Sequence, residues 1–190
     1  MSNNVISLQD VTIGYPARHH CHHVIGSNMQ ATAPKGTMTC IIGRNGTGKS
    51  TLLRSIARLQ NRLGGDILLN GHSIDSYAQD EFARLLSIVL TSRPDAQSMT
   101  VYELVALGRT PYTGFWGRLS DEDRKIVDHA LYMVGMQNMS RRRVCSLSDG
   151  ECQKVMIAKS LAQGTPIILL VEPTAFLDFH GKVELLTLLR

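Results

Sequence analysis

The sequence predicts an α/β fold in which a helical segment interrupts a core of strands and helices. Strand and helix patterns alternate at both ends of the 190-residue chain. A glycine-rich loop lies between a strand pattern and a helix pattern, and residues 92–150 have mainly helical patterns. We therefore expect a single domain, with residues 1–91 and 151–190 as the α/β core and residues 92–150 as a helical subdomain.

The composition is that of an ordinary globular domain, with 43% hydrophobic and 19% charged residues. These values exclude a disordered acidic chain, a collagen-like chain and a coiled coil. Apolar runs reach only five residues, as in Ile167–Val171, so we expect no membrane-spanning helix; the polar start predicts no secretory signal. The four cysteines form no CxxC pair, which fits a reducing cytosol, and the net charge of +4 does not by itself indicate nucleic-acid binding.

The first third of the chain contains strand, loop and helix patterns. Residues 5–13 mix apolar and polar positions like a half-buried strand, whereas residues 15–36 look irregular. Residues 37–42 form a short β-favouring run, which predicts a buried strand. Residues 49–59 place apolar side chains on one face of a helix.

Turn and cap signals organise the rest of the chain. Residues 65–69 predict a strand that runs into a turn at Asn70–Gly71, and Thr100 and Glu103 have the spacing of a capping box. The remaining expected elements are a strand over 87–90, a helix starting at Thr100, a loop at Pro111, Gly114 and Gly117, a helix from Ser120 to about Gly135, a helix over 149–162, a strand over 167–171 and a helix over 182–190.

The strongest local signal is the segment GRNGTGKS at residues 43–50, called the phosphate loop below, which matches GxxxxGK[ST] at every fixed position. Its glycines allow the backbone N–H groups to point at a phosphate, and the following helix adds the positive end of its dipole. Lys49 supplies a charge for the β- and γ-phosphates, and Ser50 offers a hydroxyl to Mg²⁺. The alternative is a strand–helix turn without a ligand.

A second group of residues lies in the last quarter of the chain. Residues 147–151, LSDGE, precede a helix, and Ser148 with Glu151 also has the spacing of a simple capping box. Glu172 follows the apolar strand 167–171. A carboxylate at the carboxyl end of a parallel strand, near a phosphate loop, can polarise an attacking water.

The phosphate loop, the LSDGE segment and the EPTAFLD segment at 172–178 together resemble the ATP-binding subunits of ABC transporters. Residues 100–109, residues 110–119 and the helix start at Ser120 make the sequence most similar to the importer branch that serves iron–siderophore complexes, haem or cobalamin. The resemblance implies a P-loop NTPase core with a RecA-like parallel sheet. It also implies an N-terminal antiparallel β part, an inserted helical subdomain and a C-terminally incomplete core.

The resemblance also assigns roles to single residues. Tyr15 would stack on adenine, although it also fits a partly buried tyrosine at a strand end. Glu172 would be the general base, Asp178 would lie at the dimer seam, and Ser50 would bind Mg²⁺. The residues that would hold the triphosphate are Gly43, Arg44, Asn45, Gly46, Thr47, Gly48, Lys49, Ser50 and Thr51. The segment that would act in trans, on ATP bound to a second copy, is Leu147, Ser148, Asp149, Gly150 and Glu151.

The function implied is that of an ATP-binding subunit that uses ATP and Mg²⁺ to drive uptake of an iron–siderophore or similar metal chelate. It would form a homodimer and dock on membrane permease subunits through residues 92–150, at the inner face of the cell membrane. Two alternatives remain: a degenerate or truncated nucleotide-binding module with little or no hydrolysis, and an ATPase acting on nucleic acid or ribosomes. Scattered positive charge argues against the second, so no nucleic-acid partner is expected.

Three departures from the family pattern leave hydrolysis open. Val171 stands where the family has an Asp that holds Mg²⁺ through water, and Thr91 stands where it usually has a Gln that reaches Mg²⁺ and the attacking water. The family's switch histidine lies further along than the last residue of this chain, and His180 is too close to Asp178 to replace it. We expect weaker use of Mg²⁺ and slower hydrolysis.

Three further features have two interpretations each. The cluster of histidines and a cysteine at 19–23 fits either a solvated loop or a zinc or nickel site. The basic run at 141–143 fits a solvated face or contact with a partner or anionic lipid. Tyr112, Phe115 and Trp116 fit a docking patch for a permease or a small satellite core.

Overall fold

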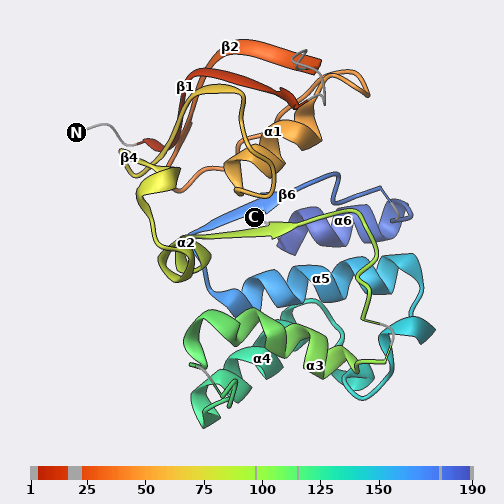
Figure 1. The fold of residues 1–190 in the computed structure, drawn as a ribbon. Coiled ribbons are helices and arrows are strands. Elements are labelled where there is room, and N and C mark those ends of the chain that lie inside the picture. Colours follow the sequence, from red (N-terminus) through yellow and green to blue (C-terminus); the bar gives the residue numbers. More distant parts are fainter. Residues whose placement is uncertain (1–3, 17–22, 97, 115, 176, 189–190) are drawn as a thin grey trace. The chain divides into compact units, whose positions relative to one another are not determined.

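The computed structural model describes residues 4–16, 23–96, 98–114, 116–175 and 177–188, and Figure 1 shows their fold. The chain divides into two compact units, residues 1–82 and residues 83–190. The expected division at residues 91 and 150 stays a prediction.

The first unit contains a four-stranded antiparallel sheet and one helix, drawn in red to yellow in Figure 1. Its strands follow the order β2–β1–β3–β4 across the sheet. Their bounds are β1 Asn4–Tyr15, β2 His23–Pro34, β3 Gly64–Leu69 and β4 His72–Ser73; the helix α1 spans Lys49–Ile56 and a 3₁₀ turn η1 spans Ile74–Ser76.

The core of the first unit forms because the strands bury alternate apolar side chains. Val11 and Ile13 of β1 and Ile67 and Leu69 of β3 are almost fully buried. Between β3 and β4 the predicted turn is confirmed, since Asn70 and Gly71 have φ values of 50° and 83°. Two consecutive positive φ angles give the tight hairpin turn whose twist matches that of the flanking strands.

The expectation that residues 15–36 are irregular is wrong, because His23–Pro34 forms β2. This strand pairs antiparallel with β1 along most of its length, from Tyr15↔His23 to Asn4↔Pro34. Most of its side chains are exposed or half-buried, and several of its residues are poor strand formers. Backbone pairing with β1, rather than apolar alternation, therefore makes it a strand.

The buried strand expected at residues 37–42 is also not observed. In the described part of the chain, these residues form no ladder, and Ile42 is 93% exposed. A buried parallel strand needs neighbouring strands for its hydrogen bonds and apolar cover on both faces. Strand propensity alone does not provide either, so this segment is an irregular connection into the phosphate loop.

The second unit places helices against a short parallel pair of strands. β5 and β6 pair in register from Leu86↔Ile167 to Val89↔Leu170. The bounds are β5 Leu86–Val89, β6 Ile167–Leu170, α3 Val101–Ala106, α4 Asp121–Met133, α5 Asp149–Gln163 and α6 Phe179–Leu188, with α2 Gln79–Leu85 at the junction of the two units and 3₁₀ turns η2 Leu107–Tyr112, η3 Gln137–Met139 and η4 Val144–Ser146.

Helix α5 is the centre of the second unit, and Figure 1 shows α3 and α4 packed beside it. Val155, Ala158 and Ala162 of α5 are fully buried and belong to one apolar cluster with residues of α3 and α4. Gly108 in η2 permits close approach to α5, because a Cβ there would lie 2.3 Å from the Lys159 carbonyl oxygen. The packing of η2 on α5 thus requires glycine at this position.

Three helices of the second unit begin with capping boxes, which confirms the two predicted at Thr100 and Ser148 and adds one at the predicted helix start Ser120. Thr100, Ser120 and Ser148 each accept a hydrogen bond from the backbone three residues later, and the acidic side chain there accepts one in return. These reciprocal bonds satisfy amides that have no partner inside a helix. Across the described part of the chain, every helix is too short or too polar to traverse a bilayer.

Candidate functional site

The phosphate loop of the first unit is shaped by glycines and begins α1. Gly46 and Gly48 have φ values of 82° and 90°, which side chains with a Cβ rarely adopt. A Cβ on Gly48 would also lie 2.4 Å from Ile25 Cγ2. Gly48 is the N-cap of α1 and provides no side-chain cap, so the first turn of this helix receives no capping bond from that position.

Lys49 closes the loop from inside α1. Its Nζ donates hydrogen bonds to the carbonyl oxygens of Gly43 at 2.8 Å and Arg44 at 2.7 Å. Thr47 adds a bond from Oγ1 to the same Arg44 oxygen at 2.9 Å. The ammonium group is therefore held over the loop backbone, where a phosphate-binding lysine is needed.

The neighbouring predicted residues of this unit occupy distinct positions. Ser50 is half-buried in the first turn of α1, and Thr51 beside it is buried. Tyr15 ends β1, pairs with His23 of β2 and is 46% exposed. A tyrosine with this exposure retains an accessible ring face, so both interpretations from the sequence remain open.

The LSDGE segment lies in the second unit as the N-terminus of α5. Ser148 Oγ accepts from the Glu151 amide at 3.2 Å, and Glu151 Oε2 accepts from the Ser148 amide at 2.7 Å. The bond from the Ser148 backbone amide to the carboxylate is the main cause that lowers the pKa of Glu151. Leu147 is buried, while Asp149 is exposed and Gly150 half-buried. The segment therefore forms a capping box, as its spacing also allowed.

Arginines on two sides hold this segment in place. Arg93, in the loop after β5, donates to the carbonyl oxygen of Leu147 and lies 3.4 Å from Asp149 Oδ1. Arg142 donates to the carbonyl oxygen of Ser146 at 2.8 Å and lies 3.6 Å from Glu151 Oε1. Sequence analysis did not single out Arg93, whose only signal was its position two residues after Thr91.

Val171 and Glu172 continue β6 beyond its last paired residue. Val171 is 2% exposed, and its amide donates to the carbonyl oxygen of Val89 at 2.9 Å. The side chain at 171 is thus an apolar group inside the unit, without an oxygen for a metal. Glu172 is exposed and has a φ of 48°, a left-handed conformation that is uncommon for residues other than glycine.

Asp178 and Thr91 have local roles in the second unit. Asp178 Oδ1 accepts from the Gly181 amide at 2.8 Å, at the start of α6. The helix begins at Phe179, three residues earlier than the sequence pattern predicted. Thr91 is half-buried and lines a small cavity together with the first turns of α5.

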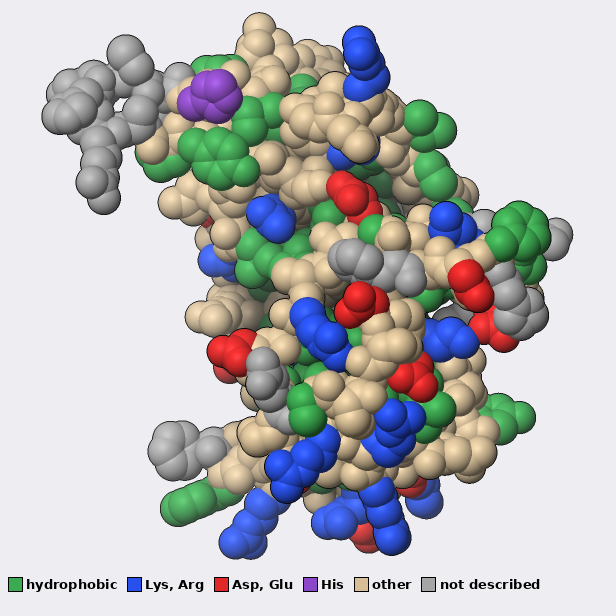
Figure 2. Space-filling model, turned by 90° about the vertical axis from the view of Figure 1, so that its right-hand side faces the viewer, with side chains coloured by type: hydrophobic (Ala, Val, Ile, Leu, Met, Phe, Trp, Pro, Cys, Tyr) green, Lys and Arg blue, Asp and Glu red, His purple; other side chains and the backbone are tan. Residues whose placement is uncertain are grey.

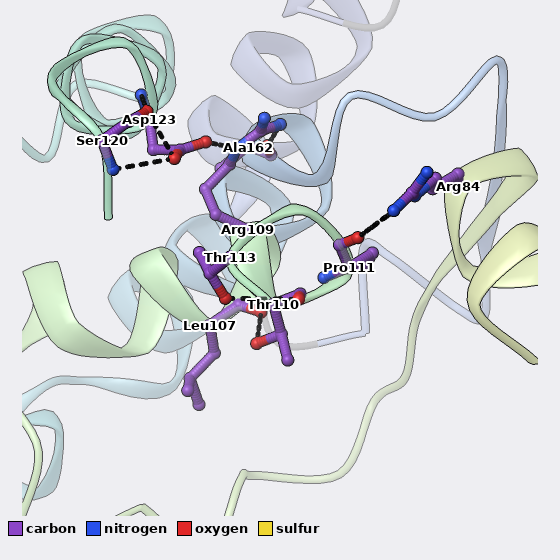
Figure 3. Close-up of polar contacts among 9 residues, drawn as sticks. All are labelled: Arg84, Leu107, Arg109, Thr110, Pro111, Thr113, Ser120, Asp123 and Ala162. Carbon is purple, nitrogen blue, oxygen red and sulfur yellow. Dashed lines mark hydrogen bonds and ion pairs between the residues drawn. The ribbon is translucent and has the colours of Figure 1, made fainter. Parts of the chain in front are cut away.

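A buried polar network of the second unit surrounds Arg109, and sequence analysis missed it. Figure 3 shows the Arg109 guanidinium between Asp123 and the Ala162 carbonyl oxygen, at 2.8 Å and 2.9 Å. Arg109 and Asp123 are both nearly buried. Hydrogen bonds from Ser120, and then from Arg109, lower the pKa of Asp123 to about 2.

Tyr112 is held by the same network. The guanidinium of Arg109 lies 4.0 Å from its ring centroid, and that of Arg84 lies 5.4 Å from it. Arg84 also donates two hydrogen bonds to the Pro111 carbonyl oxygen, one of them seen in Figure 3. This arrangement fixes a tyrosine that is still 38% exposed, close in sequence to Trp116, which is 81% exposed.

The remaining predicted features lie on the surface or outside the described residues. Figure 2 shows Lys and Arg side chains gathered at the lower part of one face, and the basic run at 141–143 is exposed. Residues 19–22 and Phe115 lie outside the described residues, so the histidine cluster and part of the aromatic patch stay predictions. Among the described residues, no group of three or more His, Cys, Asp and Glu is placed to hold a metal.

Comparison with known proteins places this loop and these capped helices in a family. The sequence profile of the ABC transporter family matches residues 27–175. The iron(3+)-hydroxamate import ATP-binding protein FhuC of Bacillus subtilis is 41% identical over 187 residues, which are 98% of this chain and 67% of that protein. The achromobactin transport ATP-binding protein CbrD of Dickeya dadantii is 42% identical over 186 residues, which are 97% of this chain and 67% of that protein.

A solved structure agrees with the sequence relatives. A dimeric ATP-binding cassette, in a post-hydrolysis state bound to ADP and phosphate, is similar with a TM-score of 0.85 and 27% identity. The match covers 97% of this chain and 81% of that one. This chain spans about two thirds of the length of its curated relatives, between 61% and 67% in the first five.

The fold and the loop define an α/β ATPase cassette, and the chain belongs to the ABC transporter family. The predicted resemblance, including its likeness to iron and siderophore importers, is confirmed by these relatives. Cassettes of this family bind ATP, generally with Mg²⁺, and work as dimers with membrane permease partners.

Proposed function

We propose that this chain is the ATP-binding subunit of an ABC importer, which binds and hydrolyses ATP to drive uptake of an iron–siderophore or similar metal chelate. The observation that carries the proposal is the phosphate loop, with its two left-handed glycines, uncapped helix start and inward Lys49. The relatives named for hydroxamate and achromobactin import support the class of cargo. An ATP-binding subunit does not contact that cargo, so its identity is set by partners.

The loop residues are suited to a triphosphate. The backbone of Gly43–Gly48 offers N–H groups, and Lys49 supplies the charge next to them. Ser50 and Thr51 begin α1, and the Ser50 hydroxyl is the oxygen ligand that we assign to Mg²⁺. Bound Mg²⁺ would neutralise charge on the β- and γ-phosphates. Tyr15 is assigned to the adenine ring because it remains exposed at the end of β1.

We assign the general base to Glu172, at the carboxyl end of β6. Its carboxylate would accept a proton from the attacking water. The left-handed backbone at Glu172 supports this assignment, since strained residues are frequent at catalytic sites. The buried Val171 beside it offers no oxygen toward Mg²⁺, and this predicts a low rate of hydrolysis.

The LSDGE segment would act on ATP held by a second copy. Ser148 and Gly150 stand at the start of α5, where the helix dipole favours an anion. Asp178 at the start of α6 is assigned to the seam of this dimer. We assign permease docking to the helical part of the second unit, where Tyr112 is fixed by two arginines, and place the assembled dimer at the inner face of the membrane.

The test is an equilibrium titration with a non-hydrolysable ATP analogue, with and without Mg²⁺, followed by a hydrolysis assay. We expect micromolar affinity that strengthens with Mg²⁺. Val171→Asp should raise the hydrolysis rate while leaving analogue affinity within about twofold, since it adds an acidic group near the metal and leaves the loop unchanged. Val171→Asn is the matched control, with the shape of Asp but no charge.

The outcomes separate the alternatives. Binding without hydrolysis in both the original chain and Val171→Asp would identify a non-hydrolysing nucleotide-binding module. Binding that does not depend on Mg²⁺ would mean that Ser50 does not hold the ion. No binding to the original chain, with its helical circular dichroism intact, would contradict the proposal itself.

A further inference from the structure

A small cavity of about 50 Å³ lies between the loop after β5 and the first turns of α5. Thr91 and Arg93 line it from the loop, and Asp149, Cys152 and Gln153 line it from the helix. Both segments belong to the second unit. The cavity is therefore a space shared by the loop that carries Thr91 and the helix that begins at Ser148.

Gln153, a residue of the cavity lining, has a buried amide. The residue is 4% exposed, and its Nε2 atom is buried with no hydrogen-bond partner among the described residues. Burial of a polar group without a partner is unfavourable, and native proteins satisfy nearly all such groups. Its neighbours do not meet this need, because Cys152 presents only a weakly polar thiol, whose pKa is raised by burial.

The size and lining of the cavity match a water molecule. One water occupies about 30 Å³ in the liquid, and a buried water typically makes two to four hydrogen bonds. Thr91 lines the cavity from the loop, and Asp149 and Gln153 line it from α5, so residues with a hydroxyl, a carboxylate and an amide all belong to its lining. A water can donate to an oxygen and accept from an N–H, so it can satisfy either end of the amide.

The contacts of Arg93 already join the same two segments on one side. Its guanidinium donates to the Leu147 carbonyl oxygen and pairs with Asp149. We propose that Gln153 is a positioning residue, which binds an ordered water in this cavity and through it holds the Thr91–Arg93 loop against the first turns of α5. The Arg93 contacts and the water bound by Gln153 would then both join this loop to α5.

The effect of this contact on ATP hydrolysis rests on the proposed function. In the proposed dimer, Thr91 belongs to the ATP site of its own chain and Ser148 to the ATP site of the partner. A loop and a helix start that are held together move as one body. Gln153 would thus couple a conformational change at one ATP site to the other site, without contacting either nucleotide.

The test compares two substitutions at Gln153 by hydrogen–deuterium exchange in the full chain. Gln153→Met keeps the length and most of the volume but removes the amide. Gln153→Asn keeps the amide and is one methylene shorter, which leaves room for a further water. We expect Gln153→Met to speed amide exchange over residues 90–93 by roughly three- to tenfold, and Gln153→Asn to change it by less than about twofold.

A packing role predicts the opposite order, because Met fills the space better than Asn. Faster exchange in Gln153→Asn than in Gln153→Met would therefore overturn the proposal, as would unchanged exchange in Gln153→Met. Exchange over α4, which does not line the cavity, and the thermal midpoint report whether the fold is kept. Met156→Leu, an apolar change in the cavity lining, is the matched control and should leave residues 90–93 unchanged.

A second measurement separates this inference from the proposed function. In the dimer, Gln153→Met should lower kcat for ATP several-fold and leave the affinity for an ATP analogue within about twofold. If the original chain does not bind ATP, the proposed function fails while the exchange result still stands. If ATP is hydrolysed normally by Gln153→Met, the consequence for coupling is contradicted.

Discussion

The helix starts of the two units are built in opposite ways. In the first unit, α1 begins at Gly48 without a side-chain cap. In the second unit, α3, α4 and α5 each begin with reciprocal bonds between a hydroxyl residue and an acidic residue. A capping box satisfies two of the amides at a helix start, whereas an uncapped start leaves those amides available for an anion. The difference makes α1 the start with more backbone amides available to a phosphate.

The comparison also bears on how Ser148 would act. Its hydroxyl accepts from the Glu151 amide within its own chain. A hydroxyl has one proton and two lone pairs, so Ser148 can cap α5 and still donate its proton outward. The same residue can therefore be structural in one copy and bind phosphate of another.

The largest expected effect on stability concerns α4, one of the capped helices of the second unit. Asp123→Ala removes the acidic half of the α4 capping box and the partner of Arg109, and leaves a buried guanidinium without its charge partner. We expect the free energy of unfolding to fall by about 3–5 kcal/mol, measured by urea denaturation. Glu103→Ala, which removes the corresponding acid of the exposed α3 box, should cost far less; equal losses would contradict the role of burial.

The next effect concerns the uncapped side. Lys49→Ala removes the charge from the phosphate loop, and we expect affinity for an ATP analogue to fall by about 100-fold. Stability should change little, because the two hydrogen bonds of Lys49 are exposed to solvent. The affinity is measured by calorimetric titration. Lys35→Ala, which changes an exposed lysine outside the loop, is the control. A loss below about fivefold would show that Lys49 does not contact phosphate.

The acidic residue of the α4 capping box, Asp123, also predicts that the fold loses stability in acid. The pKa of Asp123 is lowered from its ordinary value to about 2. Because the folded pKa is the lower one, this carboxylate stabilises the fold above pH 4, and its contribution is lost as the pH falls from 4 towards 2. We expect a loss of about 2 kcal/mol over this range, measured by denaturation at each pH. Asp123→Asn should show a flatter curve; an identical slope would contradict the assignment.

The smallest expected effect on stability is at Ser148, the cap of α5. Ser148→Ala should lower the free energy of unfolding by about 1 kcal/mol through loss of a cap, measured by denaturation. Binding of an ATP analogue to the isolated chain should be unchanged, since the phosphate loop is intact. Hydrolysis by the dimer should fall, and Ser148→Thr should restore it. A loss of stability alone would leave Ser148 as a capping residue only.

Local signals predicted well wherever the chain satisfies its own backbone groups. The caps at Thr100 and Ser148, the helix start at Ser120 and the Asn70–Gly71 turn depend on neighbours in sequence, and all are present. β2 was missed because its pairing with β1 comes from a distant segment and not from its own pattern. The strand expected at 37–42 failed for the complementary reason, since strand-favouring residues without a partner strand form no ladder.

The residues of the site also separate into those that local sequence predicts and those that depend on distant contacts. The phosphate loop could be predicted because each of its residue types has a local purpose, and the glycine conformations agree with the motif. Arg93, Arg109 and Gln153 could not be predicted, because each acts on a segment distant in sequence. A lone Arg or Gln in a sequence is ordinarily a surface residue. Its partners are known only once the chain has folded.

The hydrogen bonds of Lys49 to Gly43 and Arg44 affect how tightly any phosphate can be held. The Lys49 ammonium has three N–H donors, and the two carbonyl oxygens use only two of them. A phosphate oxygen can therefore accept from the third donor while the loop backbone keeps the ammonium in place. The lysine is thus positioned before a phosphate binds, so less side-chain freedom is lost when one does.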